Sequence, residues 1–414
     1  MSESKLETVD TLIIGGGQAG LAMSYHLTQR GQPHLVLERG RVGERWISER
    51  WLGMHFQTPN AMVTLPGYRL PAADKNPDGF GSAAEIAAYL KEYAERFAVP
   101  VRTGVTVTAL RRTDEGFAAE TSEGVFQAKN VVVATGPFQT PVIPKILPEM
   151  PGVVQMHANS YRAPEDLPPG AVLVVGAGAS GAQIADELLR AGREVYFSVS
   201  RHKRTPRRYR GYDHVRWWLE TGFVNTPASQ RPAVEIPLVH SGAYGGRTID
   251  FREFATRGMK LVGRVESAEG SVVRFAGDLL DNLAEGDAFF KAIMDGIDAF
   301  IAKTGMDRPL DPDARQLFPE PAGLRDLIRE LDLREAGVGT IIWCTGYGID
   351  YSWVDIPVID ASGKPRHQAG VTEVPGLYFL GLEWLTTIAS HFLVGVGDDA
   401  GRLATLITGK SLPG

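Results

Sequence analysis

The sequence predicts an α/β protein with two Rossmann-like units, because a pattern of apolar strand, glycine-rich loop, helix and strand occurs twice. The first copy runs from Thr11 to Glu38, and the second begins at Ala171 and ends in the basic segment 200–204. Two more apolar strands, at 131–133 and 340–343, lead into turns that contain Thr-Gly. We therefore expect parallel sheets covered by helices, with a dinucleotide site in each unit.

The first unit opens with an apolar strand at 12–14, followed by Gly15-Gly16-Gly17-Gln18-Ala19-Gly20. Gly15 permits the tight turn off the strand, Gly17 lets the backbone approach a pyrophosphate, and Gly20 lets helix and strand pack closely. The helix N-terminus adds free N–H groups and the positive end of a dipole. The pattern predicts a dinucleotide site; the alternative is a glycine-rich turn in an ordinary βαβ unit.

An acidic residue closes the second strand of this unit, which has the sequence Leu35-Val36-Leu37-Glu38. Glu38 lies about 20 residues past the loop, where a carboxylate accepts hydrogen bonds from a ribose. A loop rich in aromatic and polar residues follows. The cofactor-binding residues expected in this part of the chain are Gly15, Gly17, Gln18, Ala19, Gly20, Glu38, Arg39, Arg45 and Trp46.

The region between the two units alternates between clear periodic patterns and a proline-rich stretch. Apolar residues with helical spacing predict a helix over 82–97, and alternating residues predict strands over 100–133. Thr135 and Gly136 end the last of these strands. Prolines 137, 141, 144, 148 and 151 then indicate a linker or domain edge.

The second unit repeats the first with one informative difference. Its strand at 171–175 leads into Gly176-Ala177-Gly178-Ala179-Ser180-Gly181, a helix at about 183–189 and a strand at 195–199. That strand ends in Ser200-Arg201-His202-Lys203-Arg204 instead of an acid. A carboxylate favours a free ribose hydroxyl, whereas Arg favours a 2′-phosphate. We therefore predict FAD in the first unit and NADPH in the second.

The basic run has rival interpretations, namely a solvated face or a nucleic-acid patch, and the roles of Arg207, Arg208 and Arg210 stay open. The cofactor-binding residues expected in the second unit are Gly176, Gly178, Ala179, Ser180, Gly181, Ser200, Arg201 and Lys203.

The rest of the chain predicts a helical segment and a return to the first unit. Residues 278–333 look largely helical, the strand at 340–343 repeats the Thr-Gly turn, and a last helix begins near Gly397. Further cofactor contacts are expected from Thr135, Gly136, Thr345, Gly346, Tyr347 and Gly381. The NADPH domain is predicted to be inserted into the FAD domain, with 1–165 and 335–414 as the FAD domain and 166–334 as the NADPH domain, including a helical insertion around 278–333.

Composition narrows the class of protein. The 414 residues carry a net charge of −6, which disfavours nucleic acid as a partner. Cys344 is the single cysteine, so an intramolecular disulfide is excluded and a cytoplasmic location is expected. Residues 1–10 lack the apolar core of a signal peptide, and no apolar run is long enough to span a bilayer. The scattered histidines predict no metal site.

The segment just before the second glycine loop, Gly152-Val153-Val154-Gln155-Met156-His157-Ala158-Asn159-Ser160-Tyr161-Arg162, resembles the signature of class B flavin-dependent monooxygenases. It differs in lacking the leading Phe and in having Gly152 one residue further from His157. Tyr161 and the turn Cys344-Thr345-Gly346-Tyr347 resemble the flavin-containing monooxygenase branch. The two units, the two Thr-Gly turns and the segment Gly376-Leu377-Tyr378-Phe379-Leu380-Gly381 together resemble a two-dinucleotide-binding-domain flavoprotein over nearly the whole chain. Bacterial flavoproteins named for cation transport and plant indole-pyruvate monooxygenases are similar in general pattern.

This resemblance implies an NADPH- and O₂-dependent FAD monooxygenase. NADPH reduces FAD, O₂ forms a C4a-hydroperoxyflavin, and one oxygen atom passes to a small organic substrate. Tyr161 in place of Trp favours a soft N or S atom or an indole-pyruvate-like compound. His157 is a candidate catalytic residue that either orders NADP⁺ and protects the peroxide or joins the domains. The family's Thr-Asn pair is replaced by Gln57-Thr58-Pro59-Asn60, so Gln57 and Asn60 are both candidates for contacting the peroxide.

Several alternatives remain beside this reading. A Baeyer–Villiger monooxygenase and a non-catalytic FAD/NADPH-binding regulator both fit the two units. A thioredoxin-reductase-type disulfide oxidoreductase needs a cysteine pair, which one cysteine does not supply. His391 is either a structural histidine or a residue near the flavin face. Expected partners are a small-molecule substrate and O₂, with no nucleic acid and no membrane span, and a homodimer is left open.

Overall fold

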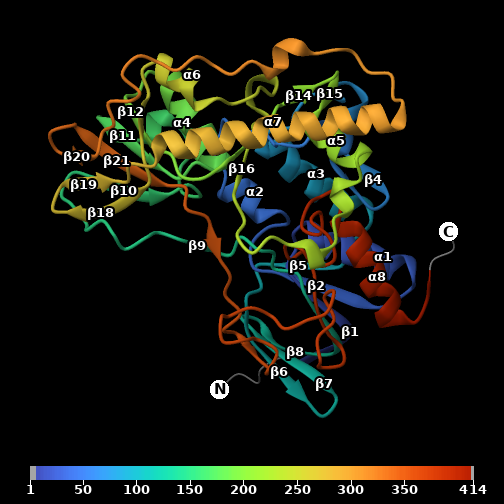
Figure 1. Cartoon of the computed structure of the whole chain (residues 1–414). Coiled ribbons are helices and arrows are strands. Elements are labelled where there is room, and N and C mark those ends of the chain that lie inside the picture. Colours follow the sequence, from blue (N-terminus) through green and yellow to red (C-terminus); the bar gives the residue numbers. More distant parts are fainter. Residues whose placement is uncertain (1–5, 412–414) are drawn as a thin grey trace.

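A computed structural model describes residues 6–411 of the chain. The fold is α/β, as predicted, with two main sheets that lie in separate halves of the molecule (Figure 1). Each glycine-rich loop follows the carboxyl end of a central parallel strand, which is where open α/β sheets bind ligands.

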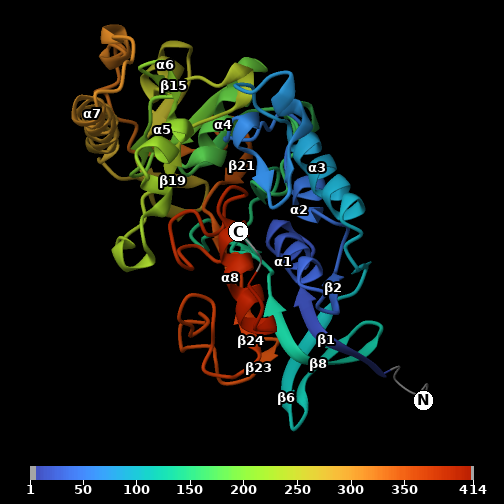
Figure 2. The same ribbon diagram turned by 90° about the vertical axis from the view of Figure 1, so that its right-hand side faces the viewer.

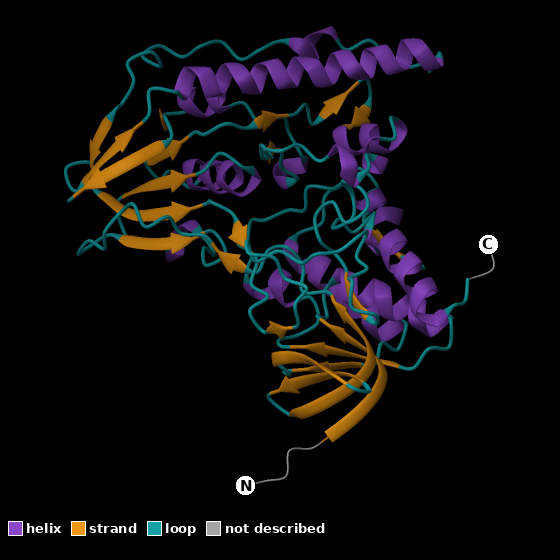
Figure 3. Ribbon diagram, turned by 60° about the horizontal axis from the view of Figure 1, so that its bottom comes forward, coloured by secondary structure: helices purple, strands orange, loops and turns teal. Residues whose placement is uncertain are grey.

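The first sheet has eight strands in the order β23-β6-β7-β8-β1-β2-β5, with β24 also paired to β8. Its parallel part is built on β1 and β8, whose apolar ends are buried. The strands are β1 (Leu6–Ile14), β2 (His34–Glu38), β5 (Val101–Thr103), β6 (Val107–Thr113), β7 (Gly116–Thr121), β8 (Gly124–Val133), β23 (Val354–Asp355) and β24 (Leu377–Phe379). The antiparallel hairpin of β6 and β7 extends the sheet at the bottom of Figure 3.

Three helices contribute apolar side chains to the core of this sheet, namely α1 (Gln18–Gln29), α3 (Ala83–Arg96) and α8 (Val396–Thr408). Helix α3 begins with a capping box, because Ser82 and Glu85 satisfy each other's backbone N–H groups. Helices α1 and α8 lie side by side in Figure 2. This pairing brings the C-terminal region back to the first glycine loop.

The second sheet has five parallel strands in the order β10-β21-β11-β12-β17. They are β10 (Val154–His157), β11 (Ala171–Val175), β12 (Val195–Ser198), β17 (Lys260–Val262) and β21 (Val338–Trp343). Alternate residues of β11 enter opposite cores: Val172 and Val174 face α4 (Ala179–Arg190), α6 (Phe251–Thr256) and α7 (Leu279–Thr304), whereas Leu173 packs toward a small antiparallel sheet. That sheet contains β18 (Val265–Glu269), β19 (Val272–Phe275) and β20 (Glu330–Asp332).

The strand pairings require a revised division into domains. β10 and β21 lie outside the predicted NADPH segment 166–334, yet both belong to the second sheet, and β21 pairs with both β10 and β11. A parallel strand buried between two neighbours cannot be assigned to another domain without breaking its backbone hydrogen bonds. We therefore propose that the second domain extends from about 153 to 344, within a first domain formed by the flanking segments.

The predicted helical insertion is shorter than expected. Helix α7 ends at Thr304 because Gly305 adopts a left-handed conformation (φ 68°) and donates its backbone N–H to Ile301. Residues beyond it form loops, a short 3₁₀ turn at Pro312–Arg315 and strand β20. The helical prediction was therefore wrong for most of 305–333, where several prolines interrupt the chain.

The remaining elements are short. They are α2 (Glu44–Ser48), α5 (His214–Glu220), β3 (Thr64–Leu65), β4 (Tyr68–Arg69), β9 (Thr140–Pro141), β13 (Lys203–Arg204), β14 (Arg208–Tyr209), β15 (Tyr212–Asp213), β16 (Leu238–Val239) and β22 (Tyr347–Gly348). In the described part of the chain, no helix combines the length and the apolar character needed to cross a membrane.

Candidate functional site

The first glycine loop has the geometry of an anion cradle. Gly15 has φ 117°, and a Cβ there would lie 2.5 Å from the carbonyl oxygen of Ala134, whereas a Cβ on Gly20 would lie 1.9 Å from the carbonyl oxygen of Gly15. Around a Cβ on Gly17, by contrast, no atom of residues 6–411 lies within 4 Å, apart from Gly17 itself and its two neighbours in the chain. The first turn of α1 contains no acidic residue. The free space over Gly17, beside a helix N-terminus, therefore fits a pyrophosphate.

Glu38 lies beside this loop, as the sequence predicts. Its Oε2 accepts a hydrogen bond from the backbone N–H of Gly16 (2.7 Å), and its Oε1 accepts one from Gly40 (2.8 Å). These bonds hold the carboxylate at the end of β2, next to the space over Gly17. Arg39, the next residue, is exposed. The position suits an acceptor for ribose hydroxyls of a dinucleotide bound at the loop.

One segment far away in the sequence lies against the same loop, and it contains Gly381, which is predicted to contact the cofactor. The side chain of Gln18 donates to the carbonyl oxygen of His391 (2.5 Å). A Cβ on Gly381 would lie 2.7 Å from the Cβ of Ala19, so the absence of a side chain lets the segment after β24 approach α1. Trp46 packs edge-on against Phe56, with ring centroids 5.3 Å apart. Segment 381–392 therefore borders the first glycine loop.

Arg45 has protein partners on both sides. It forms an ion pair with Glu49 (2.6 Å) and donates to the carbonyl oxygen of Gln139 (3.1 Å). Its pKa lies below the ordinary value because the guanidinium is partly buried. Cofactor contact by Arg45 stays a prediction.

The second glycine loop repeats the first closely. A Cβ on Gly176 (φ 112°) would lie 2.5 Å from the carbonyl oxygen of Cys344, and one on Gly181 would lie 1.8 Å from that of Gly176. Helix α4 also starts without an acid, at Ala179 and Ser180. A Cβ on Gly178 would lie 3.3 Å from Pro237, so this loop is partly covered where the first is open.

The basic residues after β12 are in different surroundings. Arg201 is exposed and forms a two-point ion pair with Glu285 of α7. The ammonium of Lys203 lies 5.0 Å from the centre of the Phe289 ring. Arg204 is buried and paired with Asp250 and Asp287. Arg201 and Lys203 are therefore available to a ligand, and Arg204 is structural.

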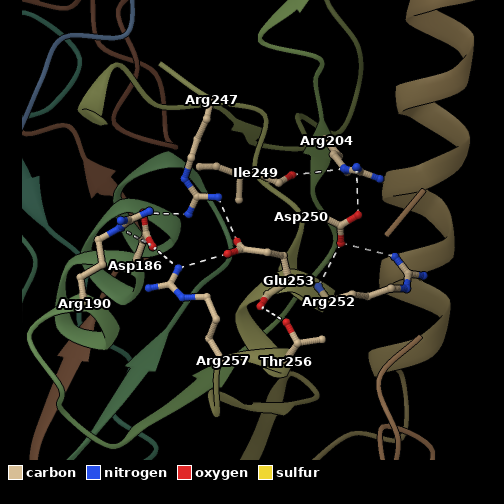
Figure 4. A network of polar contacts seen from close by, with 10 residues as sticks. All are labelled: Asp186, Arg190, Arg204, Arg247, Ile249, Asp250, Arg252, Glu253, Thr256 and Arg257. Carbon is tan, nitrogen blue, oxygen red and sulfur yellow. Dashed lines mark hydrogen bonds and ion pairs between the residues drawn. The ribbon is translucent and has the colours of Figure 1, made fainter. Parts of the chain in front are cut away.

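Arg204 belongs to a larger polar network that anchors α6 (Figure 4). Buried Asp186 of α4 pairs with three guanidinium groups, and Glu253 of α6 pairs with two of the same three. The residues drawn are Asp186, Arg190, Arg204, Arg247, Ile249, Asp250, Arg252, Glu253, Thr256 and Arg257. Buried charges need such partners. The network therefore fixes α4, α6 and the segment at Arg204 relative to one another.

The two Thr-Gly turns lie at the junction of the two sheets. Thr135 accepts a hydrogen bond from the side chain of Gln139 (3.1 Å), and Thr345 donates to the carbonyl oxygen of Val142. Gly136 and Gly346 both have positive φ angles, 73° and 82°. The turns are thus tied to the linker that follows β8, where the first sheet passes into the second.

His157 connects the end of β10 to the second of these turns. Its Nε2 donates to the carbonyl oxygen of Gly346 (3.0 Å), its Nδ1 accepts from the backbone N–H of Asn159 (3.2 Å), and its ring packs edge-on against Tyr347 at 4.9 Å. Burial lowers the pKa of His157, which favours this neutral tautomer. The contacts support the domain-joining role, and a catalytic role stays a prediction.

Gln57 and Asn60, the two candidates for peroxide contact, lie in different environments. Gln57 Oε1 accepts from Nε2 of His240 (2.9 Å), so this side chain faces the second domain. Asn60 is buried and donates to the carbonyl oxygen of Asn76 (3.0 Å) within its own loop. Gln57 therefore contacts the second domain, whereas Asn60 stays within its own loop, and contact of either residue with the peroxide stays a prediction.

A partly buried cluster of histidine and aromatic rings adjoins Gln57, and we call it the histidine cluster: His214, Trp218, His240, His391 and Phe392. Of these residues, His214 and His240 are buried. Trp218 lies 5.0 Å from His214, 6.4 Å from His240 and 6.2 Å from Phe392, and Phe392 lies 4.2 Å from His391. Burial lowers the pKa of His214 to about 3 and of His391 to about 4, and that of His240 well below its ordinary value. All three imidazoles are therefore neutral at neutral pH.

Several nitrogens of the histidine cluster have no hydrogen-bond partner within residues 6–411. They are both ring nitrogens of His214, Nδ1 of His240 and Nδ1 of His391. A buried polar atom without a partner costs about 1–3 kcal/mol, so such atoms point to a ligand or water. Sequence analysis missed His214 and His240, because the cluster joins three distant segments without a local motif.

No group of three or more His, Cys, Asp or Glu side chains in residues 6–411 is placed to hold a metal ion. Burial raises the pKa of the Cys344 thiol to about 12, so a reactive thiolate is disfavoured.

Two glycine-rich cradles, one beside a carboxylate and one beside cations, define a protein of the two-dinucleotide oxidoreductase class. Residues 12–234 match the family described as pyridine nucleotide-disulphide oxidoreductase. An uncharacterized CzcO-like oxidoreductase of Geobacillus kaustophilus is 35% identical over 397 residues, covering 95% of this chain and 96% of that protein. The chain therefore belongs to the pyridine nucleotide-disulphide oxidoreductase family.

Other matches confirm the predicted resemblance and fold. The probable indole-3-pyruvate monooxygenase YUCCA1 of Arabidopsis thaliana is 33% identical over 185 residues, 43% of this chain and 44% of that protein. A mutant flavin monooxygenase from Stenotrophomonas maltophilia shares the fold with a TM-score of 0.67 and 20% identity, covering 97% of this chain and 99% of that one.

A solved complex of OTEMO with FAD and NADP has a TM-score of 0.54 and 19% identity, covering 98% of this chain and 86% of that one. That complex contains FAD and NADP, and its likeness to this chain is one of fold.

Proposed function

We propose that the protein is an NADPH- and O₂-dependent FAD monooxygenase that acts on a small organic substrate. The observation that carries the proposal is the pair of glycine loops, each beside an acid-free helix N-terminus and each followed by a different charge. Glu38 beside the first loop favours the ribose of FAD, and Arg201 beyond the second favours the 2′-phosphate of NADPH. When bound, FAD and NADPH supply the electrons and the activation of O₂.

The residues of this chain would bind and orient these groups. Gly15, Gly17 and Gly20 shape the cradle for the FAD pyrophosphate, and Gly176 and Gly181 shape the matching turn for NADPH. His157 holds the turn at Gly346 to the second sheet, which fixes the distance between the two sites.

The histidine cluster is the proposed contact surface for substrate. It includes His391, whose carbonyl oxygen accepts a hydrogen bond from Gln18 of the first loop, and His240, which contacts Gln57. Neutral imidazoles offer a donor and an acceptor but no charge, so an uncharged group on the substrate is favoured. We retain oxygen transfer to a soft N or S atom, or to an indole-pyruvate-like compound, the latter because of the similarity to the plant enzyme.

The proposed location of the protein is the cytoplasm, and the argument for it comes from its single cysteine. The sequence has one cysteine, and burial raises the pKa of its thiol, so the thiol stays protonated. A protein without disulfide bonds fits the reducing cytoplasm. Its partners would be small molecules.

The test is anaerobic reduction followed by exposure to O₂ in a stopped-flow instrument. NADPH is expected to bleach the flavin, and O₂ is expected to give a transient near-ultraviolet absorbance that differs from oxidised flavin. With ¹⁸O₂ and a panel of thioethers, amines and indole-3-pyruvate, mass spectrometry is expected to find one labelled atom in a product. Stoichiometric hydrogen peroxide with every compound would contradict the monooxygenase proposal, and failure of NADPH to reduce the flavin would contradict the second site.

A further inference from the structure

Helix α7 lies directly over the segment that follows β12. Asn282 donates from its side chain to the carbonyl oxygen of Val199 (3.1 Å). A Cβ on Gly286 would lie 2.6 Å from Nε2 of His202, so glycine at this position is what allows the close approach. The helix crosses the top of the molecule in Figure 1, against the second domain. It therefore forms one wall of the expected 2′-phosphate site.

Each basic side chain of this segment is met by a residue of α7. Glu285 pairs with Arg201 through two contacts, of 2.8 Å to Nε and 2.5 Å to Nη2. Asp287 pairs with Arg204 at 2.8 Å. Only Lys203 faces a neutral partner, the ring of Phe289, and no carboxylate contacts it among the described residues. The helix thus decides how much positive charge this site offers.

The two ion pairs differ in exposure, and the difference sets their roles. The side chains of Arg204 and Asp287 are 7% and 9% exposed, so this pair is a fixed part of the core. Those of Arg201 and Glu285 are 57% and 37% exposed. An exposed pair contributes little to stability and opens readily. The guanidinium of Arg201 can therefore exchange Glu285 for another anion.

A 2′-phosphate would compete with Glu285 for the same atoms. Guanidinium binds carboxylate and phosphate through the same two-point geometry, so Arg201 cannot hold both fully at once. The displaced carboxylate would stay close to the phosphate and repel it. A free 2′-hydroxyl carries no charge and meets no such penalty.

We propose that Glu285 determines coenzyme specificity by competing with the 2′-phosphate for Arg201. The inference rests on the proposed function, because it requires the second loop to bind a nicotinamide dinucleotide. Glu285 of α7 would lower the affinity for NADPH. The difference in affinity between NADPH and NADH would therefore be smaller than the difference that Arg201 alone would produce.

The experiment measures ligand binding to the flavin-loaded full chain by calorimetry, without turnover. The probes are adenosine 2′,5′-bisphosphate, which carries the discriminating phosphate, and AMP, which lacks it. The variants are Glu285→Gln, Arg201→Ala and the double variant. Glu320→Gln is the matched control, because Glu320 pairs with Arg325 at 2.6 Å and its side chain is also 37% exposed.

Glu285→Gln is expected to lower the Kd for adenosine 2′,5′-bisphosphate by about threefold to fivefold, the range for a single exposed charge interaction. The affinity for AMP should not change. The gain in affinity for adenosine 2′,5′-bisphosphate should become smaller as salt is added, and the double variant should show no such gain. Glu320→Gln should leave both probes unaffected.

Four outcomes would overturn the inference. An equal gain for both probes would mean a general charge effect, and weaker AMP binding in Glu285→Gln would mean that Glu285 holds the ribose. Equal binding of both probes by the unaltered protein would refute the assignment of the 2′-phosphate to Arg201. In that case, reduction of the flavin by NADH would show that the proposed oxidoreductase function still holds. If neither probe binds, the second site itself is refuted.

Discussion

Replacing Gly17 with Ala is expected to remove FAD while leaving the fold intact. Gly17 has φ −85° and ψ −171°, angles that alanine adopts without strain, and no described atom beyond Gly17 and its two chain neighbours lies within 4 Å of the new Cβ. The stability of the apoprotein should therefore change by less than about 0.5 kcal/mol. The added methyl would occupy the space proposed for the pyrophosphate.

The expected loss of FAD affinity follows from the contacts that the methyl prevents. Hydrogen bonds to a charged group contribute about 1.5–3 kcal/mol each, and losing one such bond weakens binding by roughly 10- to 150-fold. Gly20→Ala would not separate a loss of FAD binding from a loss of structure. Its Cβ would lie 1.9 Å from the carbonyl oxygen of Gly15 and would disrupt the loop itself.

The assay is FAD content per chain after purification, together with thermal unfolding of the apoprotein. Gly178→Ala is the matched control in the second loop, where the new Cβ would lie 3.3 Å from Pro237. It should keep its flavin and lose affinity for NADPH. A Gly17→Ala protein that purifies with full FAD content would refute the assignment of the first loop.

The remaining predictions concern single side chains. Arg201→Ala should raise the KM for NADPH by roughly 30-fold, an energy on the order of 2 kcal/mol, and hardly affect NADH; equal effects in steady-state kinetics would contradict the phosphate role. His157→Ala removes the donor to Gly346 and the packing against Tyr347, so denaturant unfolding should show a loss of about 1–2 kcal/mol; unchanged stability would exclude the joining role. Burial raises the pKa of Glu187 from 4.5 to about 7, so its stabilising contribution is present below pH 4.5 and is lost as the pH rises to 7. Glu187→Gln should therefore be more stable than the unaltered protein above pH 7 and equal to it below pH 4.5; parallel pH profiles in thermal unfolding would contradict this.

The sequence predicted the elements whose signals are local. A glycine loop is visible in the chain because the turn at Gly15 and the helix contact at Gly20 each require a missing side chain within a few residues. The acid at Glu38 and the base at Arg201 are equally local, since Glu38 ends the strand that follows the first loop and Arg201 lies just beyond the strand that follows the second. The helix at 82–97 was confirmed as α3, where a capping box adds a start signal.

Tertiary structure alone decided which elements and side chains meet. β10 and β21 belong to the second sheet through pairings between strands that are far apart in sequence, and we base the proposed change of the domain boundaries on these pairings. Arg201 and Arg204 look alike in the chain, but burial against Asp250 and Asp287 makes only Arg204 structural.

The histidine cluster is a second feature that the sequence alone does not predict. His214, His240 and His391 are brought together from three segments, and desolvation then makes them neutral. Local sequence determines backbone conformation, because steric limits act between neighbouring residues. Burial, pairing and charge state depend on contacts across the whole chain, so the charge state of the histidine cluster is decided only by the tertiary structure.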